Sequence, residues 1–281
     1  MRNRRSLPAG PRNMTGSHVK KQKWKIWKYK GLRVHYLPQL DGSGRQLAEP
    51  CVNFYKTIVF AGKPFPKAFE WCCGPSFIGF ALLAEGICDR LCVADINPLA
   101  LEAVRRSVED NGLQDRVTYY LSDNFKSIPS SESFDLVVGN PPWYCTNNSA
   151  HTLCGSHYFP RMVDGVSICA IDTDWKIHRS FYRGVSEFLN PGAIVSHYVQ
   201  EPFETELFLT PRWFNRTFIE PKPFNVRPRP PIHDFREMID DGGLTYIAAI
   251  KERVFVKRWR SPKKGLWFLL SKKLSVSERE S

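Results

Sequence analysis

The chain has 281 residues, 42% hydrophobic and 24% charged, which is typical of one medium-sized folded domain with extensions. Its longest apolar run covers eight residues, 77–84, too few to span a membrane, and the basic start has no apolar segment behind it. We therefore expect neither a membrane span nor a secretory signal. The eight cysteines lack metal-ligand spacing, so we expect no metal site, and free thiols favour a cytoplasmic setting.

Positive charge is concentrated at the two ends of the chain, and the total is +12. Residues 1–50 carry 12 Lys/Arg against 2 Asp/Glu, a balance of +10. Residues 51–250 carry 18 against 23, or −5, and residues 251–281 carry 10 against 3, or +7. This distribution predicts a nearly neutral folded core with basic arms that attract an acidic partner.

The charge balance also suggests where the folded part begins and ends. We expect a basic, partly disordered extension over 1–49, a folded domain over 50–256 and a basic tail over 257–281. Residues 20–33 interleave Lys and Arg with Trp, Ile and Tyr, which fits a solvated strand edge or contact with the phosphates and bases of a nucleic acid. A short hairpin is expected to follow, with its turn at residues 41–44.

Strand and helix patterns alternate between residues 68 and 200. Apolar runs typical of buried strands lie at 68–73, 91–96, 117–121, 134–139 and 192–199, and helical patterns at 77–86, 98–111 and 175–189. Two further strands are expected near 216–220 and 245–256, with a helix at 232–240. Repeated strand–helix units of this length predict an α/β fold with a parallel sheet covered on both faces.

Four of the predicted strands are followed by polar or turn-forming residues. Ligands of such sheets bind beyond the carboxyl ends of the strands, so these segments are predicted to meet at one crevice. The four segments are 70–79, Asp95-Ile96-Asn97, Asp123-Asn124-Phe125 and Asn140-Pro141-Pro142-Trp143.

The first two segments favour a ligand with an adenosine-like part. The first holds only Gly74 and Gly79, so it matches neither the dinucleotide fingerprint nor the P-loop, and no pyrophosphate site is indicated. Asp95 ends its strand where a carboxylate can accept hydrogen bonds from both hydroxyls of a ribose. For a single Asp at this place, taken alone, capping of the following helix is the more common role.

The fourth segment is the most specific. Two consecutive prolines hold it extended and rigid. The side-chain oxygen of Asn140 and the carbonyl of Pro141 can accept both hydrogens of one planar NH2 group, and Trp143 can stack on a flat amide or base. Aligning a nitrogen lone pair with an electrophile lowers a displacement barrier by several kcal/mol, up to about 7–11 for ideal alignment. Taken alone, Pro-Pro after a strand is as often a rigid turn.

With these motifs, residues 68–200 resemble class I S-adenosylmethionine-dependent methyltransferases. The resemblance is greatest to the amino-methylating, small-domain (MTS-like) branch with an Asn-Pro-Pro-aromatic motif. That branch includes glutamine-N5 methyltransferases and the adenine-N6 and guanine-N2 methyltransferases of DNA and RNA. The resemblance implies a Rossmann-like, seven-stranded, mostly parallel sheet with helices on both faces, and S-adenosyl-L-methionine as the cofactor.

The resemblance also implies roles for individual residues. Glu70 stands at the acid that opens the glycine-rich loop, Asp95 at the acid that binds the cofactor ribose, and Asp123-Asn124 at the adenine contact. Cys72 and Ser76 replace two of the usual loop glycines, and Trp143 replaces a more usual Tyr or Phe. The implied cofactor-binding residues are Glu70, Cys72, Gly74, Asp95, Ile96, Asp123, Asn124 and Asn140, and the implied catalytic residues are Asn140, Pro141, Pro142 and Trp143.

Other polar residues of the core have a plainer interpretation. Asp172 and Asp174 lie at the start of a predicted helix, where N-terminal capping explains them at least as well as contact with a substrate. His178 and His197 are expected to be structural or solvated rather than catalytic. Cys72 and Cys73 are expected to fill space rather than act as nucleophiles.

The reaction expected from the residues and the resemblance is methyl transfer to a planar amine. An exocyclic amine of a nucleobase in RNA, attracted through the basic termini, is the leading substrate. A protein glutamine or a small-molecule nitrogen is the alternative, and a cofactor-binding module without turnover is another. The oligomeric state is left open, and no membrane partner is expected.

Overall fold

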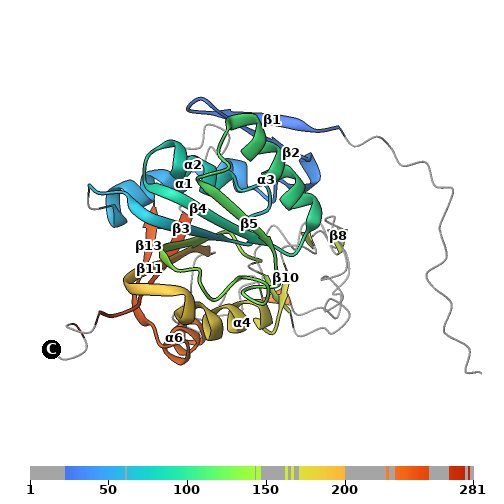
Figure 1. The fold of residues 1–281 in the computed structure, drawn as a ribbon. Coiled ribbons are helices and arrows are strands. Elements are labelled where there is room, and N and C mark those ends of the chain that lie inside the picture. Colours follow the sequence, from blue (N-terminus) through green and yellow to red (C-terminus); the bar gives the residue numbers. More distant parts are fainter. Residues whose placement is uncertain are drawn as a thin grey trace, which may run out of the picture.

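The computed structural model describes residues 23–60, 62–142, 144–146, 162–163, 166–167, 171–199, 226–227, 232–252, 266–275 and 278. A seven-stranded sheet with the order β13-β14-β11-β6-β3-β4-β5 lies at its centre (Figure 1). The strands are β3 (Phe65–Trp71), β4 (Cys88–Asp95), β5 (Val117–Leu121), β6 (Phe134–Gly139), β11 (Leu189–Val199), β13 (Thr245–Glu252) and β14 (Leu266–Lys272). β14 is antiparallel to both strands that it pairs with, β11 and β13, and the other pairs of adjacent strands in this sheet are parallel. The Rossmann-like α/β sheet predicted from the sequence is confirmed.

Helices cover both faces of the sheet (Figure 1). One face carries α1 (Gly44–Phe54), α2 (Phe77–Ala84) and α3 (Pro98–Asn111), and the other carries α4 (Lys176–Val185) and α6 (Ile232–Asp241). Short helical turns connect them: η1 (Pro38–Leu40), the π-helical turn η2 (Tyr55–Val59) and η5 (Ser186–Phe188). None of the helices in these ranges is both long and apolar enough to cross a bilayer.

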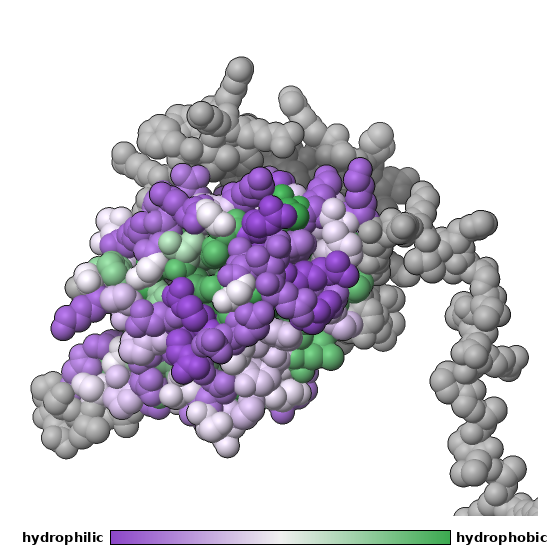
Figure 2. Space-filling model, turned by 45° about the horizontal axis from the view of Figure 1, so that its top comes forward, coloured by the Kyte–Doolittle hydropathy of each residue, from purple (hydrophilic) through white to green (hydrophobic). Residues whose placement is uncertain are grey.

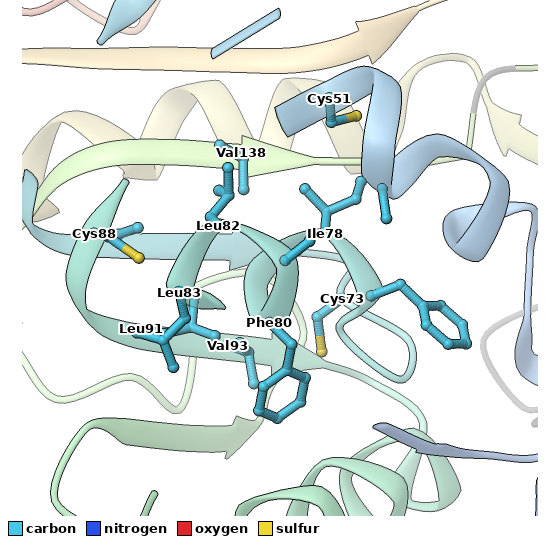
Figure 3. Packing of buried hydrophobic residues seen from close by; sticks show 14 of the residues in the cluster. Cys51, Cys73, Ile78, Phe80, Leu82, Leu83, Cys88, Leu91, Val93 and Val138 are labelled. Atoms are coloured by element: carbon cyan, nitrogen blue, oxygen red, sulfur yellow. The ribbon is translucent and has the colours of Figure 1, made fainter. Parts of the chain in front are cut away.

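The core beside α2 explains why that helix has no polar face. Figure 3 shows Ile78 and Leu82 near Val138 and Cys51, and Leu83 near Leu91. The helix is enclosed by α1 and the sheet, and its first seven residues are buried. A helix that is apolar on all sides is stable only in such surroundings, so α2 and the loop before it are held firmly.

Several short strands lie outside the main sheet. β10 (Ile171–Thr173), β7 (Tyr144–Thr146) and β12 (Val226–Arg227) form a small sheet with β7 in the middle. β8 (Met162–Val163) and β9 (Val166–Ser167) pair with each other. Because β7 begins two residues after Pro142, the small sheet anchors the chain directly beyond the Asn-Pro-Pro segment.

The structure differs from the sequence-based expectation at both ends of the chain. A hairpin is present, but it consists of β1 (Lys25–Tyr29) and β2 (Leu32–Tyr36), and its turn lies at Lys30-Gly31 instead of 41–44. Residues 41–44 instead lead into α1, which crosses the expected boundary at residue 50. Residues 266–272, expected in a basic tail, form β14 between β11 and β13.

The other elements agree closely with their predictions. The helix expected at 175–189 divides into α4 and η5, and β11 already begins at Leu189. The helix expected at 232–240 is α6, and the strand expected at 245–256 is β13 as far as Glu252. The strand expected near 216–220 lies outside the described residues.

Candidate active site

The loop between β3 and α2 has an unusual backbone conformation. Cys72, Gly74 and Ser76 have φ angles of 50°, 51° and 63°, so every second residue lies in the left-handed region. Two of the three carry side chains, although this region strongly favours glycine. Cys72 and Ser76 therefore occupy positions where the backbone itself calls for the glycines that the resemblance implies.

Glu70, near the end of β3, accepts hydrogen bonds from the loop and from the start of α2. Its side chain is buried, and Oε2 accepts hydrogen bonds from Ser76 Oγ at 2.5 Å and from the Gly79 amide at 2.8 Å. Burial raises the pKa of Glu70 to about 8, although both hydrogen bonds act in the opposite direction. The carboxyl group thus faces the loop and the start of α2, and it fixes the backbone that would contact a ligand.

Asp95 links the loop to the end of β4. Oδ2 accepts from the Gly74 amide at 2.7 Å, and Oδ1 accepts from the Asn97 amide at 2.9 Å. Burial raises the pKa of this carboxyl group as well. Each carboxylate oxygen has two lone pairs, so both oxygens can accept one further donor, such as a ribose hydroxyl. Asn97 caps α3 through the Leu99 amide, so Asp95 is not needed as the cap.

Apolar surface lies beside Asp95. Ile96 is 49% exposed directly after the strand, whereas Ile78 and Ile87 are buried in the core. An exposed branched side chain next to a ribose-binding carboxylate offers a surface on which a flat base can pack. The pair of residues therefore has the mixed character that an adenosine needs.

Asp123 and Asn124 have different surroundings. Asp123 is exposed and forms an ion pair with Lys126 at 2.5 Å. Asn124 is buried with a φ of 51°; its Oδ1 accepts from Trp71 Nε1 at 2.7 Å, and its Nδ2 donates to the carbonyl of Ile177. The side chain of Asn124 therefore supports Trp71, and only Asp123 and the backbone of this segment face outward at the edge where Asp95 lies.

Asn140 offers an unused acceptor. Its Nδ2 donates to the carbonyl of Gly42 at 3.1 Å, which is the only orientation of the amide that makes a hydrogen bond with a carbonyl. Oδ1 is buried and has no hydrogen-bond partner in the part of the chain that the structure describes. Buried acceptors are nearly always satisfied, so this oxygen points to a missing donor.

The neighbours of Asn140 fix its position. A Cβ on Gly139 would lie 2.9 Å from the carbonyl oxygen of Trp71, so only glycine allows β6 and β3 to end this close together. Pro141 is buried and Pro142 is half-buried. Trp143, assigned from the sequence to stacking on the substrate, lies outside the described residues.

One wall of the site is formed by the segment between β2 and α1, and it was not predicted from the sequence. The carbonyl oxygen of Leu40 would lie 3.4 Å from a Cβ on Gly74, and Gly42 binds Asn140. The segment thus connects the glycine loop with the amine-binding loop, 98 residues apart from Gly42 to Asn140. Its Asp-Gly-Ser-Gly sequence was a visible signal, but it indicated a hairpin turn.

Part of the chain is similar to known proteins. Residues 60–155, about a third of the chain, match the model of the methyltransferase small domain. The ribosomal RNA small subunit methyltransferase C of Actinobacillus pleuropneumoniae serotype 7 is 32% identical over 124 residues, which cover 44% of this chain and 36% of that protein. The release factor glutamine methyltransferase of Rhodopirellula baltica is 30% identical over 81 residues, 29% of this chain and 27% of that protein.

The chain thus spans about a third of the length of the curated relatives it matches first. Among solved structures, Trm5b from Pyrococcus abyssi is similar with a TM-score of 0.52 at 15% identity, covering 90% of this chain and 56% of that one. The 16S rRNA N2 G1207 methyltransferase from Thermus thermophilus, solved with AdoMet and guanosine, has a TM-score of 0.50 at 12% identity, covering 89% and 50%. The resemblance to class I methyltransferases is confirmed in fold and in the matched segment.

Proposed function

We propose that the chain is an S-adenosylmethionine-dependent N-methyltransferase that acts on an exocyclic amine of a nucleobase in RNA. The observation that carries this proposal is the buried, unpartnered side-chain oxygen of Asn140. An NH2 donor satisfies this acceptor, and the rigid Pro141-Pro142 backbone places a second acceptor beside it. The relatives named above are methyltransferases, which supports the same reaction class.

The residues that would hold the cofactor fit its chemistry. Asp95 retains lone pairs for the two ribose hydroxyls, Ile96 offers an apolar surface for the adenine, and the backbone of the Gly74 loop allows a close approach. S-adenosylmethionine supplies an electrophilic methyl group on a sulfonium when it is bound. Residues 70–79 contain no Lys or Arg, and the carboxyl groups of Glu70 and Asp95 contact the loop, which suits a sulfonium cation better than a phosphate and is consistent with the missing pyrophosphate motif.

On the substrate side, the work of the protein is positioning. Asn140 Oδ1 and the carbonyl of Pro141 would each accept one hydrogen of the amine, and the nitrogen lone pair is then directed away from both acceptors. Fixing the nitrogen in this way replaces a bimolecular encounter with an aligned one, which accounts for a large part of the acceleration in such displacements. Gly42 contributes because its carbonyl keeps the Asn140 amide in the productive orientation.

The basic hairpin favours RNA over the other substrates. Lys25, Lys28 and Lys30 are exposed and have no ion-pair partner within the described ranges. The face that carries the hairpin and α3 is mostly polar, with small apolar areas between the polar side chains (Figure 2). Free lysines on such a surface attract phosphates and release counterions on binding.

The hairpin also lies close to the site. Its Trp27 and Tyr36 rings pack edge-on against Phe77, the first residue of α2 after the glycine loop, with ring centroids 5.4 and 5.2 Å apart. Trp24 lies under the guanidinium of Arg106. Because these aromatic rings pack on the protein, we expect the hairpin to contact phosphates rather than to stack on bases, which narrows the role suggested by the sequence.

A protein glutamine remains the second candidate substrate, since the same acceptor pair also fits a planar amide. The release factor glutamine methyltransferase of Rhodopirellula baltica favours it, although over a shorter match than the RNA enzymes. A cofactor-binding module without turnover is the third candidate function, because Cys72 and Ser76 replace two of the usual loop glycines.

The test is transfer of a labelled methyl group from S-adenosylmethionine to total RNA and to total protein of a cell extract. The proposal expects label in RNA that nuclease removes and that base analysis places on an exocyclic nitrogen. Label that resists nuclease and is removed by protease would contradict the RNA substrate, and cofactor binding without any label would support the module without turnover.

The role of the hairpin is tested separately with Lys28→Ala. We expect a higher KM for RNA and an unchanged kcat. The slope of log KM against the logarithm of the salt concentration should decrease by about one, because one phosphate contact is lost. The matched control is Lys63→Ala, which removes an exposed lysine just before the amino end of β3. It should change none of these quantities. Equal effects of both variants would refute a specific role of the hairpin.

A further inference from the structure

A buried polar network lies beside the amine-binding loop, and the proposed chemistry does not use it. Asp172 and His178 form a hydrogen-bonded pair, with Oδ2 and Nδ1 2.7 Å apart. The hydroxyl of Tyr182 and Nε2 of His197 are also 2.7 Å apart. All four residues are at most 1% exposed. The sequence left open whether the two histidines are structural or solvated; because both are buried, the solvated role is excluded and the structural role remains.

Buried polar groups of this kind are costly unless every one of them is satisfied. Asp172 meets this demand: besides the His178 ring, its oxygens accept from the backbone amides of Ile177 at 2.9 Å and His178 at 3.1 Å. It therefore caps α4, one of the two roles that the sequence allowed. An Asn or Ser would cap a helix equally well, so capping alone does not explain a fully buried carboxylate paired with an imidazole.

The network touches the chain on both sides of Asn140. Before it, His197 on β11 is the register partner of Gly139 on β6. After it, Asp172 on β10 is the register partner of Cys145 on β7. Trp71 lies between the two, with its ring edge-on to both imidazoles and its carbonyl against Gly139. The four residues thus connect α4 to both strands that flank the amine-binding loop.

The turn that joins β10 to α4 shows that the network resists strain. Asp174 and Trp175 have φ angles of 53° and 55°, a region that side-chain-bearing residues rarely adopt. The hydrogen bonds of Asp172 to the first amides of α4 close this turn. Without them, the turn can relax and β10 can shift along its partner β7.

We propose that Asp172 and His178 are positioning residues, which hold β10 against β7 and thereby fix the backbone of the amine-binding loop from Asn140 onward. The proposal deepens the proposed function and rests on it for the catalytic consequence. It assigns these two residues no contact with the substrate. Their pair fixes the position of the acceptors of Asn140 and Pro141 and leaves the cofactor side, at Glu70 and Asp95, untouched.

The experiment compares Asp172→Ala, which removes the ring pair and both bonds to the amides of α4, and His178→Gln, which removes the ring, with Val185→Ala. The control removes buried apolar volume from the same helix, α4, without removing a hydrogen bond. Three quantities are measured on the full chain: hydrogen exchange of a peptide covering 134–146, affinity for S-adenosylmethionine by calorimetry, and kcat and KM for methyl transfer to RNA.

We expect exchange at 144–146 to accelerate at least tenfold in both network variants and less than twofold in Val185→Ala. Cofactor affinity should stay within twofold, while kcat falls at least tenfold and KM for the cofactor is unchanged. A role limited to stability predicts that all three variants behave alike, and this result would overturn the proposal. Unchanged exchange at 144–146 would overturn it too, whatever the activity. If the wild type labels no RNA, the proposed function fails, and the exchange experiment still decides this inference.

Discussion

Gly79→Ala is the substitution that tests the description of the cofactor loop most severely. A Cβ at this position would lie 2.5 Å from Glu70 Oε2, 2.7 Å from Ser76 Oγ and 2.9 Å from Leu91 Cδ2. The first two atoms belong to the hydrogen bonds that hold the loop, and all three groups are buried. The new methyl group must therefore displace the Glu70 carboxyl group, which cannot move into solvent.

The magnitude follows from three contributions. Overpacking a tight core costs about 1–3 kcal/mol, and losing hydrogen bonds to a buried carboxyl group costs about 1.5–3 kcal/mol. Alanine gains about 1 kcal/mol over glycine in a helix. We expect Gly79→Ala to lower the free energy of unfolding by about 2–4 kcal/mol, and to weaken binding of S-adenosylmethionine at least tenfold because the loop above Glu70 shifts.

The assay is urea unfolding followed by circular dichroism, together with calorimetric titration with the cofactor. Gly184→Ala is the matched control, since Gly184 is also a helical glycine, and the atom nearest to its Cβ would be Cδ2 of the Phe125 ring at 3.2 Å. That variant should stay within about 1 kcal/mol of wild type and bind the cofactor normally. Equal stability and affinity in the two variants would refute the role given to Glu70 and the loop.

Three further predictions concern the same loop. Asp95→Asn removes one acceptor and should raise the Kd for S-adenosylmethionine at least tenfold, about 1.4 kcal/mol, in the same titration; an unchanged Kd would rule out ribose binding by Asp95. Burial raises the pKa of Glu70 from 4.5 to about 8, so the folded state holds that proton more tightly than the unfolded state. The free energy of unfolding should therefore fall by up to about 5 kcal/mol between pH 4.5 and 8, and Glu70→Gln should remove this fall in urea titrations at several pH values; parallel pH profiles would contradict it. Cys72→Gly relieves a left-handed residue and should stabilise the fold by about 1 kcal/mol, whereas Cys73→Gly should destabilise it; the reverse order in urea unfolding would contradict the backbone argument.

The parallel part of the sheet was predictable because its central strands are short and contain runs of apolar residues that are buried on both faces. β4 and β6 are of this kind. β4 ends in Asp95 and β6 is followed directly by Asn140, so both polar residues lie at the carboxyl ends of the strands, where ligands bind. The local sequence pattern therefore predicts both the strand and the end of the sheet at which the last residue of that strand lies.

β14 was not predictable from charge, which was the quantity used for the C-terminal residues. Its apolar run Leu266–Leu270 is short and is flanked by lysines, so the net charge of +7 indicated a tail. In the structure the two lysines after the run pair locally: Lys272 with Glu278, and Lys273 with the carbonyls of Ser186 and Leu189. A strand in the middle of a sheet needs only its own few apolar residues, whatever the charge beside them.

The site shows the same division between local and non-local information. The acceptor Asn140 was predictable because the Asn-Pro-Pro sequence fixes its own backbone. The contact of Asn140 with Gly42 was not, because two loops 98 residues apart meet only in the folded chain. The left-handed φ angles of Cys72 and Ser76 could not be predicted from the residue types either, since neither residue is a glycine.

The most direct test of the central claim is single-turnover methyl transfer to RNA by wild type and by Asn140→Ala, with cofactor affinity measured separately. The proposed function predicts label on an exocyclic base nitrogen with wild type, and a rate at least a hundredfold lower with Asn140→Ala, about 2.7 kcal/mol, at unchanged Kd for S-adenosylmethionine. Asn190→Ala is the control. It loses a hydrogen bond to Asp135 near the amino ends of β11 and β6, away from Asn140, and should transfer the methyl group at the wild-type rate. Transfer by Asn140→Ala at the wild-type rate would contradict the claim that this oxygen holds the amine.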